Sequence, residues 1–129
     1  MYGFNISLSG SMADIRGRVV EELQNAGFGV LTEIDVAATL KKKIDVDRKP
    51  YIILGACHPA SADRALQAVP GVGVLLPCNV TVSVEDGRTV VRAMDPASAM
   101  GVLEEPDLEE VGTQVGAALR RVIESMESA

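Results

Sequence analysis

Near its start the chain alternates between apolar and polar residues, and this period of two predicts a half-buried β-strand over residues 2–8. The apolar face of that strand carries Tyr2, Phe4, Ile6 and Leu8. Residues 12–26 change to helical spacing, with an apolar stripe of Ile15, Val19, Leu23 and Ala26. We expect Ser11 to cap this helix and Gly27 to end it.

The next apolar segments predict two further strands, each followed by a helix. A strand is expected over residues 28–34, and a short helix over residues 35–44 with Asp35 as its cap. Residues 51–56 are apolar without alternation, which is typical of a strand covered on both faces or of one shared with a partner. A helix over residues 60–68 should follow, with three side chains facing inward: Ala62, Ala65 and Leu66.

Asp86-Gly87 is a strong hairpin signal because it stands between two alternating apolar segments. We expect a long strand over residues 72–85, bent at Pro77, to pair with the segment after the turn. The expected register places Glu85 opposite Arg88 and Val80 opposite Ala93. One face of this hairpin carries the valines, and the other carries polar residues: Asn79, Thr81, Ser83 and Arg92.

The last third of the chain predicts a loop and a long helix. Residues 95–106 read as a loop with a helical turn at 97–102. A helix then begins at Pro106-Asp107, with Asp107 and Glu110 as a possible capping box. Its core stripe is Leu108, Val111, Val115, Leu119, Val122 and Met126.

The predicted order is β-α-β-α-β-α-β-β-α, with no internal repeat and no linker. A sheet with helices mainly on one face is the natural packing for this order, which predicts an α+β fold. A chain of 129 residues is the usual size of one domain, so we expect a single domain over residues 1–129.

Composition and net charge restrict the classes of function that the chain can have. Hydrophobic residues make up 47% of the chain and charged residues 23%, which is ordinary for a globular protein. The net charge of −6 disfavours binding to nucleic acid, and only four aromatic residues are available to stack on bases. The local basic run Lys41-Lys42-Lys43 is expected to be a solvated helix end.

No apolar stretch approaches the length of a membrane span, and the N-terminus has no basic region or apolar run of signal length. We therefore expect a cytoplasmic protein without a membrane partner. Its two cysteines are then expected to be reduced thiols.

The polar residues that stand out are Cys57-His58 and Cys78-Asn79. His58 is the only histidine, so a histidine metal cluster is excluded and a hydrolase triad would depend on this one residue. The helix between strand 51–56 and strand 72–85 suggests a crossover, which would make these strands parallel neighbours or near neighbours. Cys57 and Cys78 could then lie close in space.

Three hypotheses for the two cysteines remain open. Both could be small apolar core residues, as free cysteine usually is. They could form a reversible disulfide or a peroxide-reactive thiol, with a thiolate stabilised by His58 and by the N-terminus of helix 60–68. Alternatively, Cys57, His58 and Cys78 could supply three metal ligands, although adjacent ligands such as Cys57-His58 are geometrically awkward.

Other candidates carry weaker signals. Asp95-Pro96 follows the hairpin and could close the same end of the sheet, and a turn-forming role is the preferred interpretation of Asp95. Gly71-Val72-Gly73 is not a dinucleotide-binding motif, because it lacks the third glycine and precedes a strand. No catalytic constellation is recognised, so an enzymatic activity is not predicted, and no cofactor is indicated.

The chain resembles domain-of-unknown-function family 302 in several motifs, which occur in matching order over about residues 5–125. They are Gly27–Ile34, Gly55-Ala56-Cys57-His58-Pro59, Leu75-Leu76-Pro77-Cys78-Asn79-Val80 and Met94-Asp95-Pro96. One departure is His58, which stands where the family usually carries asparagine. The resemblance implies a TBP-like, helix-grip fold and a dimer whose two sheets pack orthogonally.

We therefore expect a small cytoplasmic α+β protein that acts as a homodimeric binding or accessory module. Helix-grip folds often hold a small apolar ligand between the sheet and the long helix. The alternative is a thiol-based redox or metal-binding protein that uses Cys57 and Cys78. The candidate binding residues are Cys57, His58, Cys78, Asn79 and Asp95.

Overall fold

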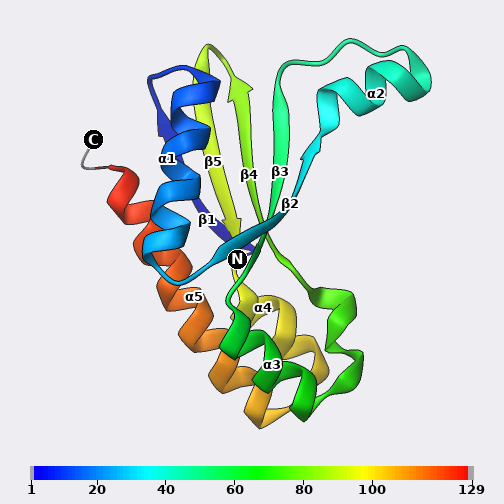
Figure 1. Cartoon of the computed structure of the whole chain (residues 1–129), viewed down its shortest axis with the longest axis vertical. Helices are drawn as coiled ribbons and strands as arrows, with labels where there is room; N and C mark the ends of the chain where they lie inside the picture. The colour runs from blue at the N-terminus through cyan, green and yellow to red at the C-terminus, as the bar shows by residue number, and fades with distance from the viewer. Residues whose placement is uncertain (1, 128–129) are drawn as a thin grey trace.

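The structure is a computed structural model that describes residues 2–127. Five strands form one open antiparallel sheet in the order β1-β5-β4-β3-β2 (Figure 1). The strands are β1 (Gly3–Leu8), β2 (Gly29–Asp35), β3 (Tyr51–Cys57), β4 (Cys78–Glu85) and β5 (Arg88–Met94). This is the α+β class that the order of apolar patterns predicts.

The helices fall into three groups (Figure 1). Helices α1 (Met12–Asn25) and α5 (Pro106–Met126) cover one face of the sheet. A lobe beyond one end of the sheet contains α3 (Pro59–Ala68), α4 (Pro96–Met100) and the N-terminal half of α5. Two short 3-10 helices, η1 (Pro70–Leu75) and η2 (Gly101–Leu103), complete the ordered elements, and α2 (Val36–Ile44) projects away from the body.

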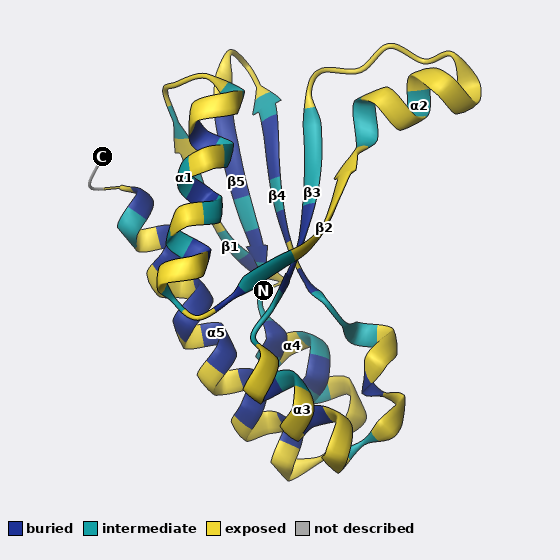
Figure 2. Cartoon of the chain, in the orientation of Figure 1, coloured by how far each residue is buried: buried dark blue, intermediate teal, exposed yellow. Residues whose placement is uncertain are grey.

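The core lies between the sheet and the two covering helices, as the buried segments in Figure 2 show. Ile15, Val19 and Leu23 of the predicted α1 stripe are buried, and Ser11 accepts a hydrogen bond from the backbone N–H of Asp14 as a helix cap. The sheet contributes fully buried valines from β4 and β5: Val80, Val82 and Val91. All six residues of the predicted α5 stripe are buried as well.

The β4–β5 hairpin has the expected register. Glu85 pairs with Arg88, and Val80 pairs with Ala93. Asp86 and Gly87 both have positive φ angles, of 51° and 76°, as a two-residue turn of this kind requires. The two turn residues, Asp86 and Gly87, therefore set the register between β4 and β5.

Strand β3 is buried on both faces over three consecutive residues, Leu54, Gly55 and Ala56. Gly55 is required there, because a Cβ atom at this position would lie 2.2 Å from Thr32 Oγ1 and 2.9 Å from Pro77 Cγ. The expectation of a strand covered on both faces therefore holds for the second half of residues 51–56, whereas the first half, Tyr51 to Ile53, is only half-buried.

Five local expectations were wrong. Tyr2, expected on the apolar face of the first strand, lies before β1 and is 74% exposed. Residues 70–75 form η1 instead of the start of a long strand, and β4 begins only after Pro77, which has no N–H to donate to a sheet. Strands β3 and β4 are antiparallel, because α3 and η1 lie beyond one end of the sheet and do not cross its face. No side chain caps α5, whose N-cap is Glu105, and Leu66 is 42% exposed.

The arm that carries α2 has no buried residue from Val36 to Pro50. Asp35 caps α2 as predicted, and Lys41 forms ion pairs with Asp45 and Asp47 at 2.8 and 3.1 Å. The basic run is therefore a solvated helix end in this chain. Within the described residues, the helices are too short or too polar to cross a membrane.

Candidate functional site

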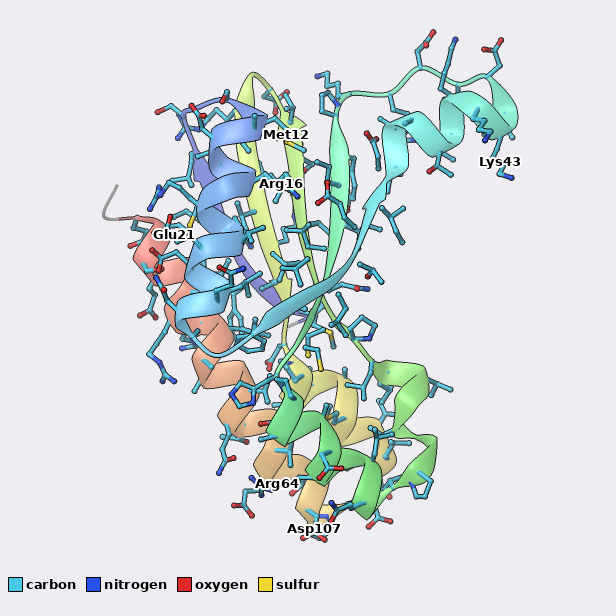
Figure 3. All side chains as sticks on the ribbon, viewed as in Figure 1. Met12, Arg16, Glu21, Lys43, Arg64 and Asp107 are labelled. Carbon is cyan, nitrogen blue, oxygen red and sulfur yellow. The ribbon has the colours of Figure 1, made fainter. Side chains whose placement is uncertain are left out.

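A cavity of about 320 Å³ separates the end of the sheet from the helical lobe. Strands β2 and β3, the start of β4, and helices α3, α4 and α5 all contribute to its wall. Most of its lining is aliphatic: Leu31, Ala56, Ala62, Ala65, Leu66, Leu76, Pro77, Met100, Val111 and Val115. Figure 3 shows Arg64 and Asp107 on the outer surface of the lobe, away from the sheet.

Cys57 and Cys78 both line this cavity. Ala56 pairs directly with Cys78 across the β3–β4 ladder, and Cys57 is the next residue along β3. Cys57 is half-buried, whereas Cys78 is only 5% exposed, and both are free thiols. Burial, reinforced by the nearby Cys57, raises the pKa of Cys78 to about 11. The Cys78 sulfur is therefore a protonated thiol at neutral pH.

His58 is the N-cap residue of α3 and also lines the cavity. Its Nδ1 atom lies 2.9 Å from the hydroxyl oxygen of buried Ser61, one helical turn later. The ring packs edge-on against Phe28, and its Nε2 edge faces Gly27, where an added Cβ would lie 3.1 Å away. His58 is thus held in one orientation by α3 and by the turn between α1 and β2.

The cavity combines a large apolar wall with a few polar groups. The polar groups are the two thiols, the His58 ring, and the hydroxyls of Ser61 and Thr32. Protein sites for small molecules have this character: mostly hydrophobic walls with a few polar groups that orient the ligand. The arrangement is suited to holding a molecule with an apolar body next to a thiol.

Asn79 and Asp95 lie outside the cavity. Asn79 is exposed on the opposite face of the sheet, in a shallow hollow with Tyr2, Tyr51 and Arg92. Asp95 is the N-cap of α4, and its carboxylate accepts hydrogen bonds from the backbone N–H of Ala97 and the hydroxyl of Ser98. The structure therefore gives Asp95 the turn-forming role that its sequence context favours.

The three-ligand metal hypothesis does not match the geometry. Among residues 2–127, no three histidine, cysteine, aspartate or glutamate side chains come together in a way that could hold a metal ion. Cys57, His58 and Cys78 share the cavity wall without forming such a set, and His58 Nδ1 is occupied by Ser61.

Several lining residues carry no sequence signal for a binding site. Val111 and Val115 look like ordinary core positions of a helical stripe, and Met100 lies in the helical turn expected at 97–102 within a loop. Ser61 is the exception, because its spacing of three from His58 at a helix start indicates that the two side chains meet. The cavity arises from elements that are far apart in the chain.

The comparisons with known proteins bear on the family and the fold of the chain. The chain matches the family model described as "Domain of unknown function DUF302" over residues 4–126. It is also similar to the crystal structure of an uncharacterized conserved DUF302 protein from Bacillus stearothermophilus, with 30% sequence identity and a TM-score of 0.90. That similarity covers 96% of this chain and 97% of the other. No curated protein matches the chain.

Proposed function

The chain belongs to the DUF302 family, and we propose that it is a homodimeric binding or accessory module that holds a small apolar ligand in the cavity. The observation that carries this proposal is the cavity of about 320 Å³ with its aliphatic wall. The cavity opens to solvent, since Leu31 on its wall is 67% exposed and Leu66 is 42% exposed, and an open concave surface with so apolar a wall is the usual character of a small-molecule site.

The shape of the wall supports a ligand with an apolar body. Val111 and Val115 of α5 and Ala65 of α3 form part of the lining, and all three are buried. Burying apolar ligand surface against them is favourable by about 25 cal/mol per Å². The half-buried Cys57 and His58 stand where a polar end of the ligand would be oriented.

A second copy of the chain is proposed because apolar side chains remain uncovered. Tyr2 on the open side of the sheet is 74% exposed, and Ile44 at the end of α2 is 63% exposed. Ile34, on the strand that leads into α2, is also exposed. Contact with a second copy would remove such groups from water. We place the dimer in the cytoplasm, where its free cysteines would stay reduced.

Binding can be tested with N-phenyl-1-naphthylamine, an uncharged probe whose fluorescence rises in apolar surroundings. We expect saturable binding with a Kd on the order of 1–10 μM. Val111→Phe should weaken binding at least about tenfold, because the added ring occupies the cavity. The matched control Thr113→Phe places the same ring on the exposed side of α5 and should leave binding unchanged. Equal fluorescence from the wild type and Val111→Phe would refute the proposed site.

The dimer is tested separately by sedimentation equilibrium at micromolar concentration. The expected mass is twice the 13.6 kDa of one chain. A mass that stays at one chain would remove the second copy from the proposal and leave the cavity site intact.

A further inference from the structure

The arm over residues 36–50 carries a net charge opposite to that of the rest of the chain. It holds five cationic side chains and two carboxylates, a net charge of +3. The other residues hold seven cations and sixteen carboxylates, a net charge of −9. Every lysine of the chain lies in the arm: Lys41, Lys42, Lys43 and Lys49. The arm is therefore a basic element on an acidic protein.

Most of these cations have no partner in their own chain. Lys41 forms ion pairs with Asp45 and Asp47. Among the described residues, the other four cations of the arm are exposed and form no ion pair: Lys42, Lys43, Arg48 and Lys49. Apolar side chains stand beside them, since Ile44 is 63% exposed and Val46 is 38% exposed. The arm thus presents unpaired cations together with uncovered apolar groups.

The helical lobe presents the complementary surface. Residues 93–119 contain six carboxylates and no lysine or arginine. Within the described part of the chain, four of these carboxylates are exposed and form no ion pair: Glu104, Glu105, Asp107 and Glu109. The two residues before them, Val102 and Leu103, are 79% and 36% exposed. We call residues 102–109 the acidic edge of the lobe.

The arm and the acidic edge lie at opposite ends of one molecule, so they do not meet within a chain. Figure 3 shows Lys43 on the arm and Asp107 at the far end of the lobe, with the sheet between them. Two copies that lie side by side in opposite directions bring the arm of each next to the acidic edge of the other. Unlike charges then face each other, and the apolar side chains of both surfaces leave water.

From these features, and resting on the second copy in the proposed function, we propose that the arm of each copy docks on the acidic edge of the other. Twofold symmetry makes this contact reciprocal, so both arms and both acidic edges are used. The assembly then closes at two chains, because no docking surface is left to recruit a third.

The first test is a zero-length cross-link between amines and carboxylates, made with a water-soluble carbodiimide in a mixture of ¹⁴N- and ¹⁵N-labelled protein. Because every lysine lies in the arm, each lysine cross-link reports where the arm is docked. We expect mixed-isotope peptides that join Lys42, Lys43 or Lys49 to the acidic edge. Mixed-isotope peptides that join these lysines only to carboxylates elsewhere would overturn the proposal, as would their absence.

The second test exchanges the charges. The arm variant combines Lys42→Glu, Lys43→Glu and Lys49→Glu, and the edge variant combines Glu104→Lys, Glu105→Lys and Glu109→Lys. Each variant alone brings like charges together at both contacts, so its dimer should dissociate at least about tenfold more readily than the wild type. An equimolar mixture should form dimers again, because a dimer with one copy of each variant has unlike charges at both contacts. Wild-type dimerisation by either variant alone, or a mixture that stays monomeric, would contradict the docking.

A matched control changes the net charge by the same amount outside the acidic edge. It combines Glu21→Lys, Glu124→Lys and Glu127→Lys, three exposed positions on α1 and at the end of α5. This variant should dimerise as the wild type does. A loss equal to that of the edge variant would show that net charge, and not the acidic edge, governs association.

Sedimentation equilibrium separates this inference from the proposed function. If the wild type is a dimer and both charge variants remain dimers, the docking of the arm is wrong and the homodimer stands. If the wild type is a single chain, the docking and the homodimer are both wrong, and the cavity is still judged by its own probe. Binding of the wild type, but not the arm variant, to phosphatidylglycerol vesicles without mixed-isotope cross-links would assign the arm to a lipid surface and overturn the proposal.

Discussion

The two halves of α5 carry the same apolar stripe but meet different surroundings. In the C-terminal half, Val122 is 3% exposed and lies in the solid core, close to where Arg18 of α1 reaches the backbone oxygens of Ser125 and Met126. In the N-terminal half, Val111 is 2% exposed and belongs to the same hydrophobic core, yet it also lines the cavity. The exposed fraction of a side chain therefore does not show whether the residue only packs in the core or also lines a binding site. What shows it is whether the side chain faces other side chains or a cavity.

The largest expected contrast comes from the same substitution in each half. Val122→Phe should destabilise the protein by about 2–3 kcal/mol, because a packed core has no room for the ring. Val111→Phe should cost less than about 1 kcal/mol, because the ring enters the existing cavity. Urea denaturation followed by circular dichroism measures both changes. An equal loss of unfolding free energy in the two variants would mean that the N-terminal half of α5 is packed as tightly as the C-terminal half.

The second contrast uses the buried end of β4, where Cys78 lies. Its pKa is raised from 9.0 to about 11, so between these values the native state keeps a proton that the unfolded chain has lost. The resulting stability is fully present below pH 9 and is lost as the pH rises through about 11, by on the order of 2 kcal/mol. Denaturation of Cys78→Ala should lack this alkaline loss. A wild-type stability that stays constant from pH 9 to 11 would show that the thiol is not desolvated.

The smallest effect is expected at the exposed end of the same strand. Hydrogen bonds from Arg92 and, to a lesser extent, Ser83 lower the pKa of Glu85 from 4.5 to about 2. The folded state therefore keeps the carboxylate ionised, and this contribution is lost as the pH falls from 4.5 towards 2. Solvent screening keeps it smaller than the Cys78 effect, and salt should reduce it further. Acid titration of Glu85→Gln should show a shallower loss than the wild type at low salt, and an unchanged slope would contradict the ion pair.

Much of the fold could be predicted because its signals are local. The α1 stripe, the Asp35 cap of α2 and the Asp86-Gly87 hairpin depend on residues within a few positions of one another. Their outcomes agree with the sequence-based expectations. Local signals misled over residues 72–75, which were expected to begin a strand although the chain forms a 3-10 helix there.

The candidate site could be predicted only in part. Cys57, His58 and Cys78 do meet at one cavity, although the argument that brought them together assumed parallel strands, and β3 and β4 are antiparallel. Asn79 stands beside Cys78 in the chain but points to the other face of the sheet, as the alternation of side chains along a strand requires. Neighbouring positions in the chain thus predicted the cavity residues Cys57, His58 and Cys78 correctly, but wrongly included Asn79.

Short-range periodicity, turn residues and caps were sufficient to specify most of the elements and the α+β class. Hydrogen bonding and side-chain direction within an element repeat every two or every 3.6 residues, so these signals are local. The hollow between β3, α3 and α5, the closeness of Cys57 to Cys78, and the exposure of the α2 arm were decided only by the tertiary structure. Whether a side chain faces another side chain, a cavity or water depends on how the helices and strands pack against one another. That placement is a property of the packed chain and not of any one segment.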